Sequence, residues 1–384
     1  MKICFISHSA RLGGAEMVLL ETIEVLQESG ARCYAVLPAR GPLLVELEKL
    51  HVPTLVTSYA LWASRERLSL PRRARAMLNL TLKSAVIAWQ VGRWGCDVIY
   101  SNTTTVSVGA FAAALLGRPH VWHLHEFGSA LGLQFLLGEK WSYRIMNRLS
   151  SLVIAPSQAV GTEAGRWLRD APLQVVYCSL HRTFRDDGCA AFSNGRYRCV
   201  IAGAIAENKR QEDAVRAMLE LRQRQIEAEL LVIGEGDRDY EKYLQNLVAQ
   251  YHLQDRIRFL GHLNDPLPQL RAADVVLVCS RAEGFGRVTV EAMLAGKPVI
   301  GANNTATAEL IRHGANGLLY QTADPQDLAN KIDYLYRHPD IASQLGETGQ
   351  IWARRMFTRD RYCDQLLPLL TDLLPDAAAL PAPI

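Results

Sequence analysis

Two carboxylates lie in the segment RAEGFGRVTVEAMLAGKPVIG (281–301). Glu283 belongs to a loop after a predicted strand, and Glu291 follows after seven intervening residues, in a helix predicted from about Arg287 to Leu294. A carboxylate that accepts hydrogen bonds from paired hydroxyl groups suits sugar binding, because charge-assisted hydrogen bonds are roughly twice as strong as neutral ones. The alternative is a surface loop with two solvated glutamates. On spacing alone the two interpretations are equally supported.

The loop that carries the first carboxylate also has the composition of an anion site. Gly284, Phe285 and Gly286 lie between the predicted strand and the predicted helix, and glycines allow a phosphate or a sugar to approach the backbone closely. In an open parallel sheet a ligand binds at the carboxyl ends of the strands, where the first N–H groups of the following helix are free to bind an anion.

These residues must be positioned by an α/β fold. With 384 residues the chain is too long for one hydrophobic core, so two domains are expected. Short β-branched runs alternate with helical patterns, which is typical of βαβ units with a parallel sheet. Between the two series the polar, aperiodic segment 179–197 is interpreted as a linker. The strands are predicted at residues 2–7, 32–38, 54–58, 97–102, 120–125, 152–157 and 173–178, and then at 198–204, 229–235, 256–262, 274–280, 297–303 and 317–321.

Composition and charge exclude several classes of protein. The formal net charge of +3 is too small to indicate nucleic acid as a partner. The eight cysteines are scattered and form no C-x-x-C pair, which indicates a reducing compartment and no metal site. The N-terminal apolar run KICFISHS is too short for a signal peptide, and no uncharged stretch is long enough to span a bilayer. A cytoplasmic protein is expected, with any membrane contact at the inner surface.

The segment 281–301 closely resembles the signature of glycosyltransferase family 4, in the EGFG loop, in the second glutamate of EAM and in the G-K-P-V-I turn. The family has the GT-B fold, with two Rossmann-like domains facing each other across a cleft. The resemblance implies that Glu283 lies by the donor sugar and that Glu291 hydrogen-bonds the nucleotide ribose. It also implies an N-terminal acceptor domain (1–180), a C-terminal nucleotide-sugar domain (196–357) and a final helix (358–374) that packs back on the first domain.

Other motifs match the family elsewhere in the chain. IAGAIAENKRQEDAVRA (201–217) resembles its glycine and lysine segment, which implies that Lys209 meets the donor diphosphate. The family often has an arginine where this chain has Ala204, and Arg210 is the candidate replacement. LVIGEG (231–236) resembles the loop around the nucleotide base and includes Gly234. HSARLGGAEMVLLE (8–21) is similar to the Gly-Gly-Ala-Glu turn, in which Gly13 and Gly14 open a helix.

The motif WHLHEF (122–127) contributes a histidine pair at the end of a strand. His123 and His125 are two residues apart and point to one face of a strand, as metal ligands can. No third ligand with suitable spacing is visible, so no metal is expected. By the resemblance, His125 lies near the transferred sugar and His123 is structural; the alternative is that His125 is also a hydrogen-bonded core residue.

By the resemblance, the chain is expected to be a retaining glycosyltransferase. It would move a sugar from a nucleotide diphosphate donor to an acceptor hydroxyl, without cofactor or metal, in the synthesis of a cell-surface polysaccharide or a glycolipid. The catalytic residues would be His125, Lys209 and Glu283. Two alternatives remain, a phosphorylase or synthase-like enzyme on the same scaffold and a non-catalytic nucleotide-sugar-binding subunit. The nucleotide, the sugar and the acceptor are not specified by these motifs.

One further segment is unusually basic. Residues 64–93 combine cations with Leu, Met, Ile and Trp, which is the pattern of an amphipathic helix on an anionic membrane. A solvated helix face is an equal alternative. The cations are Arg65, Arg67, Arg72, Arg73, Arg75 and Lys83.

Overall fold

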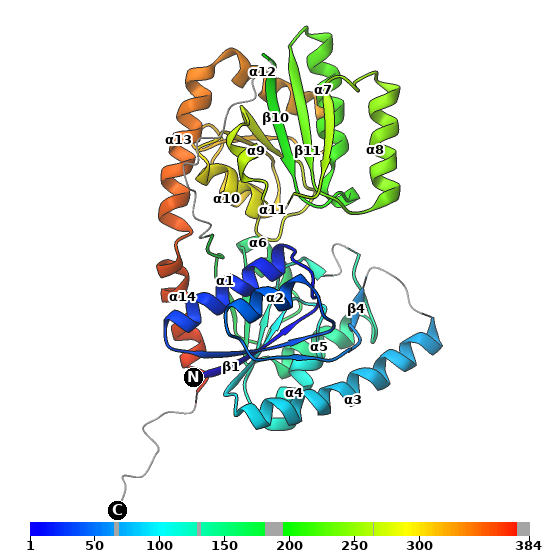
Figure 1. Cartoon of the computed structure of the whole chain (residues 1–384), viewed down its shortest axis with the longest axis vertical. Coiled ribbons are helices and arrows are strands. Elements are labelled where there is room, and N and C mark those ends of the chain that lie inside the picture. Colours follow the sequence, from blue (N-terminus) through cyan, green and yellow to red (C-terminus); the bar gives the residue numbers. More distant parts are fainter. Residues whose placement is uncertain (65–68, 129–131, 181–194, 264, 375–384) are drawn as a thin grey trace, which may run out of the picture. The chain divides into compact units, whose positions relative to one another are not determined.

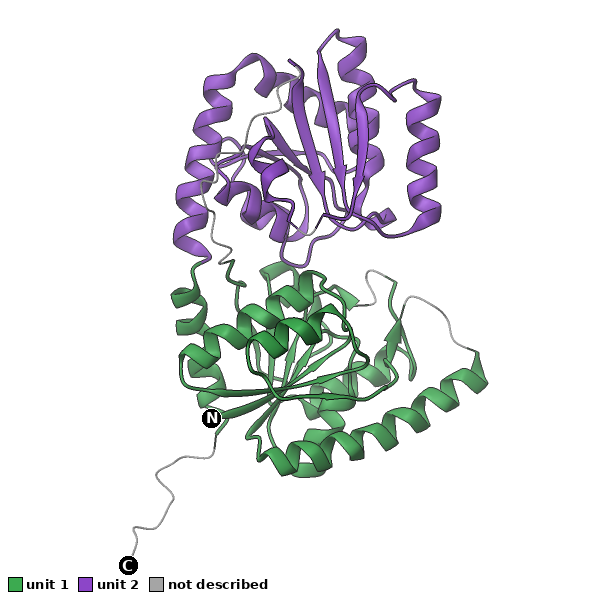
Figure 2. Cartoon of the chain, viewed as in Figure 1, with its two compact units in different colours: residues 1–181, 358–384 green, residues 182–357 purple. Residues whose placement is uncertain are grey.

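The chain forms two compact units, and the polypeptide enters the first of them twice. The computed structural model describes residues 1–64, 69–128, 132–180, 195–263 and 265–374. Unit 1 comprises residues 1–181 and 358–384, and unit 2 comprises residues 182–357 (Figure 2). The boundary between them lies within the polar segment 179–197.

Unit 1 is built on a parallel sheet of seven strands. Successive strands are added first on one side of β1 and then, from β5 onward, on its other side, so the strand order reverses between β1 and β5. In spatial order the strands are β3 (Thr54–Val56), β2 (Arg32–Leu37), β1 (Lys2–Ser7), β5 (Val98–Asn102), β6 (His120–His123), β8 (Leu152–Ala155) and β9 (Leu173–Val175).

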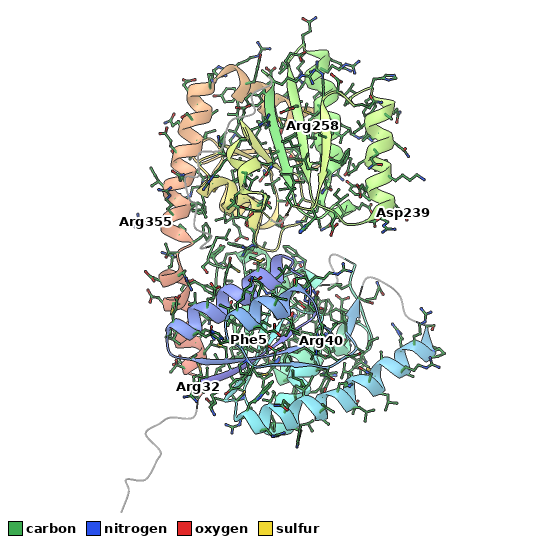
Figure 3. The ribbon with its side chains drawn as sticks, in the orientation of Figure 1. Phe5, Arg32, Arg40, Asp239, Arg258 and Arg355 are labelled. Carbon is green, nitrogen blue, oxygen red and sulfur yellow. The ribbon has the colours of Figure 1, made fainter. Side chains whose placement is uncertain are left out.

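Helices cover both faces of this sheet (Figure 1). They are α1 (Gly14–Glu28), α2 (Pro42–Lys49), α3 (Leu70–Trp94), α4 (Val108–Leu116), α5 (Glu139–Leu149), α6 (Gln158–Gly165) and α14 (Arg359–Thr371). Side chains alternate across β1: Ile3 and Phe5 face a core shared with α1, α2 and α14, whereas Ile6 packs near Gly109 of α4. Figure 3 shows Phe5 among the side chains of unit 1.

Helix α14 completes the core of unit 1 from the far end of the sequence. Tyr362 is fully buried, and its hydroxyl hydrogen-bonds the hydroxyl of Thr22 on α1 at 2.8 Å. Leu366 and Leu370 lie one and two turns further along and are also buried in this core. The apolar spacing of four residues places all three side chains on one helix face.

Unit 1 also contains a small sheet that the sequence analysis missed. Strands β4 (Ala63–Ser64) and β7 (Gln134–Phe135) pair in an antiparallel arrangement. Each has only two residues, which is too short for an alternating pattern to be recognised. Trp62, next to β4, is buried against Trp122 and Phe135, so aromatic packing fixes the position of this sheet.

Unit 2 contains a second parallel sheet, of six strands, with a similar reversal of order between β10 and β13. In spatial order the strands are β12 (Ile257–Gly261), β11 (Ala228–Ile233), β10 (Tyr197–Ala202), β13 (Val275–Val278), β14 (Val299–Ala302) and β15 (Leu318–Tyr320). Nearly continuous apolar runs form these strands because helices cover both faces of the sheet. Each strand predicted from the sequence is present in one of the two sheets, and most end one to three residues earlier than predicted.

The helices of unit 2 bury the second core. Cys199 and Ile201 of β10 face a cluster that includes side chains of α7, α8 and α12, while α10 packs on β13 and β14 and against α13. The helical elements are η2 (Glu207–Lys209), α7 (Gln211–Gln223), α8 (Arg238–Gln250), α9 (Leu267–Arg271), α10 (Arg287–Leu294), α11 (Thr305–Leu310), α12 (Pro325–Arg337) and α13 (Pro339–Met356).

Candidate active site

Lys209 and Glu283 are in direct contact at the reversal point of the second sheet. The Lys209 Nζ atom lies 2.5 Å from Glu283 Oε1, although the residues are 74 positions apart in the sequence. Lys209 ends the short helix η2 after β10, and Glu283 lies in the loop after β13, which is the neighbouring strand. Ligands of open α/β sheets bind at this kind of position, where the strand order reverses.

Backbone and side-chain bonds hold the two loops together. The backbone N–H of Arg281 donates to the carbonyl oxygen of Asn208 at 2.7 Å, next to Lys209. The hydroxyl of Ser280 donates to Glu283 Oε1 at 2.5 Å. The side chains of Lys209 and Glu283 are 28% and 15% exposed, so their charges interact at the edge of unit 2 while a solute can still reach them.

The next loop supports Glu283 from the other side. The backbone N–H of Glu283 donates to Thr305 Oγ1 at 3.0 Å, and the Asn304 side-chain amide donates to the carbonyl oxygen of Ser280 at 3.1 Å. Thr305 has a φ of +40°, which is strained for a β-branched residue. Strain of this kind persists only where surrounding contacts impose it, and here it presents the hydroxyl to the carboxylate loop.

Helix α10 begins at the glycine loop and carries the second glutamate. Gly286 precedes the helix with a φ of +89°, where a side chain would be strained. Glu291 is buried, and its Oε1 lies 3.7 Å from a guanidinium nitrogen of Arg287, one turn earlier. Arg287 was not selected from the sequence, although its spacing of four residues from Glu291 was a visible signal.

Two predicted donor-binding residues have clear packing roles. Phe285 is buried, and its ring packs edge-on against Phe357 with centroids 5.5 Å apart. The Arg210 guanidinium donates two hydrogen bonds to the buried carboxylate of Asp213, at 2.8 and 3.0 Å. These bonds raise the pKa of Arg210. The Arg210 side chain is therefore directed at Asp213, whose carboxylate also accepts from the hydroxyl of Tyr320.

Gly234 and Gly203 allow two neighbouring loops of unit 2 to meet. They follow β11 and β10 and have φ values of +134° and +137°, which L-residues rarely adopt. A Cβ atom on Gly234 would overlap the carbonyl oxygen of Gly203, whereas a Cβ atom on Gly203 would meet nothing within 4 Å. The backbone conformation therefore favours glycine at both positions, and at Gly234 the close approach of the Gly203 carbonyl oxygen also excludes a side chain.

This pair separates backbone strain from steric overlap in a matched test. We expect Gly203→Ala to lower the free energy of unfolding of unit 2 by about 1 kcal/mol, the lower end of the cost of such backbone strain. Gly234→Ala adds the overlap and should cost about 2–3 kcal/mol. Thermal denaturation followed by circular dichroism measures both. Equal losses would mean that the overlap is relieved by a backbone shift and contributes nothing.

In unit 1, His125 is held by Asn102 at the reversal point of the first sheet. Asn102 ends β5, and its side-chain Nδ2 donates to the carbonyl oxygen of Ala15, near the start of α1, at 3.0 Å. Its Oδ1 therefore faces His125 Nε2, 2.7 Å away. An amide oxygen only accepts, so Nε2 of His125 carries the proton in this hydrogen bond. Asn102 was not identified from the sequence.

The other histidine of the motif, His123, is part of the core, as predicted. His123 is fully buried, and its Nδ1 lies 2.8 Å from the hydroxyl of Tyr100. Burial lowers the pKa of His123 to about 3, so the ring is neutral. The ring centroids of His123 and His125 lie 4.2 Å apart, so the neutral core histidine packs against the partly buried His125.

Glu126, the next residue in the motif, was missed by the sequence analysis. Its Oε1 accepts the backbone N–H of Thr104 at 3.1 Å. Burial raises the pKa of Glu126 to about 7, against the opposing effect of the backbone hydrogen bonds. Thr103, which precedes Thr104 and follows Asn102, has a φ of +100°, so the loop after β5 is strained beside both His125 and Glu126.

The Gly-Gly-Ala-Glu turn starts helix α1 beside the same sheet edge. Gly13 precedes the helix and Gly14 is its first residue, and the Glu16 carboxylate accepts the backbone N–H of Gly13 at 3.1 Å. His8, at the end of β1, lies 3.1 Å from the other oxygen of Glu16. Burial lowers the pKa of His8, and the charge of Glu16 acts in the opposite direction. The turn therefore presents a buried glutamate and a histidine close to Asn102.

Two family models match the chain consecutively. "Glycosyltransferase Family 4" matches residues 12–182, and "Glycosyl transferases group 1" matches residues 190–352. Among solved structures, the chain is similar to HepE of Anabaena in complex with UDP-glucose, with a TM-score of 0.81, 27% identity, and coverage of 97% of this chain and 100% of that one. Sucrose-phosphate synthase of Thermosynechococcus elongatus shares the fold, with a TM-score of 0.78, 19% identity, and coverage of 97% and 99%.

Curated relatives match over shorter regions. N-acetyl-alpha-D-glucosaminyl L-malate synthase of Bacillus anthracis is 30% identical over 44% of this chain and 43% of its own length. D-inositol 3-phosphate glycosyltransferase of Pseudarthrobacter chlorophenolicus is 28% identical over 67% of this chain and 66% of its own length. The match thus spans less than half of the first relative and about two thirds of the second. With its two parallel-sheet units and both halves matched by family models, the chain belongs to the group 1 glycosyltransferases of family 4, which have the GT-B fold.

Proposed function

We propose that this chain transfers a sugar from a nucleoside diphosphate sugar to an acceptor hydroxyl with retention of the anomeric configuration. The contact between Lys209 and Glu283 carries this proposal. It places a cation suited to a diphosphate next to a carboxylate suited to sugar hydroxyls, at the reversal point of a parallel sheet. Both side-chain bonds of Glu283 that the structure gives, from Lys209 and Ser280, end on Oε1, so Oε2 would be the oxygen that accepts from the sugar hydroxyls.

Lys209 would act mainly on the departure of the leaving group. Negative charge grows on the diphosphate as the bond to the anomeric carbon breaks, and a preorganised ammonium group stabilises that charge more than it stabilises the bound donor. The first N–H groups of α10, after Gly286, supply further positive potential. Glu291 would hydrogen-bond the ribose from the second turn of the same helix.

The pairing of Glu283 also supports attack on the same face from which the leaving group departs. A double displacement needs a carboxylate nucleophile and a second carboxyl group about 5 Å from it. Glu283 is instead bound by Lys209 and Ser280, and a carboxylate held by a cation is a weak nucleophile. His125, whose Nε2–H is held by Asn102, would act near the transferred sugar.

A uridine diphosphate sugar is the donor to test first. The HepE structures, 26–27% identical over the full solved chain, contain UDP or UDP-glucose. We propose that the reaction needs no metal, because Lys209 supplies positive charge at the diphosphate. The product would belong to a cell-surface polysaccharide or a glycolipid.

The test uses UDP-glucose, in which the glucosyl group is joined to the diphosphate in the α configuration, with GDP-mannose and ADP-glucose for comparison. Proton NMR identifies the anomer that first appears on transfer to an acceptor sugar, or to water when no acceptor is added. We expect the α-anomer, at a rate that EDTA does not change. The β-anomer would contradict retention. Donor binding without turnover would favour a binding subunit, and turnover of a sugar phosphate without nucleotide would favour a phosphorylase.

A further inference from the structure

Helix α3 has a second apolar face that is exposed at the surface of unit 1. Leu80, Ile87 and Val91 are buried and form the inner face. On the opposite side the exposed residues repeat at intervals of three or four, so they form one stripe along the helix. This outer stripe consists of Arg75, Leu78 (62% exposed), Leu82 (58%), Val86 (45%), Trp89 (62%) and Arg93.

The charges of α3 all have the same sign. The helix from Leu70 to Trp94 contains four arginines and one lysine and no aspartate or glutamate. Arg72 and Arg75 lie near its start and Arg93 near its end, and all three are exposed. Lys83 is turned back toward the sheet, where its Nζ donates to Thr57 Oγ1 at 3.0 Å. The apolar stripe is therefore flanked by cations at both ends. Two further predicted cations, Arg65 and Arg67, lie outside the described residues.

The neighbouring helix extends this surface. Helix α4 packs along α3 (Figure 1), and Gly92 of α3 lies close to the Leu116 side chain at the end of α4. Leu115 is 64% exposed, and Arg118, just beyond the helix, is also exposed. Apolar and basic side chains thus continue from α3 onto α4.

We propose that this outer face of α3 binds the surface of an anionic lipid bilayer. The stripe from Arg75 to Arg93 is about 27 Å long at the rise of an α-helix, and it suits a helix lying in the plane of the interface. Leu78, Leu82 and Val86 enter the boundary between headgroups and acyl chains, and Trp89 lies at the level of the headgroups. No helix in the described ranges is long and apolar enough to cross a bilayer.

Charge complementarity favours lipid over a second copy of the chain. In a dimer formed through this face, the arginines of one helix would lie against those of the other without an acidic partner on either helix. An anionic leaflet supplies the opposite charge along the full stripe. The Arg93 guanidinium lies 4.9 Å from the centre of the Trp89 ring, which is a geometry that keeps the cation at the same level as the indole.

The experiment is co-sedimentation of the full chain with vesicles of phosphatidylcholine, with and without phosphatidylglycerol. We expect binding only to the anionic vesicles at low salt, and a steep loss at an ionic strength where the Debye length is about 3 Å. Arg75→Gln/Arg93→Gln should weaken the binding about 25-fold, or about fivefold for each cation. The matched control is Arg354→Gln/Arg355→Gln on α13, which removes the same charge from an exposed site in unit 2 and should change binding less than twofold (Arg355 is labelled in Figure 3).

A second pair of variants tests the apolar stripe. Leu82→Gln/Trp89→Gln keeps all the cations and should still reduce binding at least tenfold. Its control is Ile351→Gln, because Ile351 is 72% exposed on α13 and should be neutral. Binding of the wild type to both kinds of vesicle alike, or to neither, overturns the proposal. So does a wild-type dimer that Leu82→Gln/Trp89→Gln converts to a monomer without any change in vesicle binding.

Discussion

Replacement of Lys209 by alanine is expected to lower kcat by about 10²–10³-fold, the usual cost of removing one preorganised group from a developing negative charge. The KM for the donor should rise much less, because the charge that Lys209 meets grows in the transition state. The fold should persist, because the Lys209 side chain is 28% exposed and Glu283 keeps its bond from Ser280. Steady-state kinetics with the nucleotide sugar that binds measures both constants.

The control for this variant is Lys242→Ala on α8, which removes an exposed lysine from the same unit. It should leave kcat and KM unchanged. A Lys209→Ala enzyme with wild-type rates would contradict the assignment of Lys209 to the diphosphate. The cation to test next would be the exposed Arg281, whose backbone N–H donates to the carbonyl oxygen of Asn208. Arg210 is a poorer replacement, because its guanidinium is committed to Asp213.

Glu291→Ala is expected to weaken nucleotide binding by about 10–100-fold. The buried carboxylate would lose its charge-assisted hydrogen bonds to the ribose, each of which contributes about 1.5–3 kcal/mol, and tenfold in affinity corresponds to about 1.4 kcal/mol. Isothermal titration calorimetry with the free nucleoside diphosphate measures the effect without turnover. Because the ribose contact is made in the bound donor and in the transition state alike, kcat should change less than the affinity.

An isosteric variant separates charge from shape at this position. Glu291→Gln keeps an acceptor oxygen but removes the charge, so its affinity should lie between those of the wild type and of Glu291→Ala. Thermal denaturation must be compared as well, because both substitutions leave Arg287 without the carboxylate 3.7 Å from it. Wild-type affinity in Glu291→Ala, with the fold retained, rules out the ribose contact.

Most of the fold could be predicted because its strands are buried on both faces. Runs such as those of β1 and β11 are almost continuously apolar, and they stand out between helical patterns. The ends of the strands were less accurate, since residues 124–125 and 176–178 remain apolar or aromatic beyond His123 and Val175, the last paired residues of β6 and β9. The two-residue strands β4 and β7 had no pattern to detect and depend on the packing of Trp62.

The candidate site was predicted as separate motifs but not as a set of contacts. The resemblance selected Lys209 and Glu283 individually, and the contact between them follows from parallel pairing of β10 with β13, which brings two distant loops together. Phe285 matched a motif, but packing against Phe357 explains equally well why this position is a phenylalanine. Asn102 and Glu126 were missed because their roles depend on contacts with residues from other strands. Such contacts cannot be predicted from the spacing of residues within one segment.

The bond between α14 and α1 has a consequence for the order in which the protein folds as it is synthesised. Unit 2 is one continuous segment, residues 182–357, whereas unit 1 needs Tyr362, Leu366 and Leu370 to fill a core that begins at Ile3. Domains generally fold during synthesis in N-terminal to C-terminal order. Here the unit that emerges first from the ribosome is completed last. The residues of unit 2 therefore leave the ribosome before α14 does, and the face of α1 that receives Tyr362 stays uncovered until then.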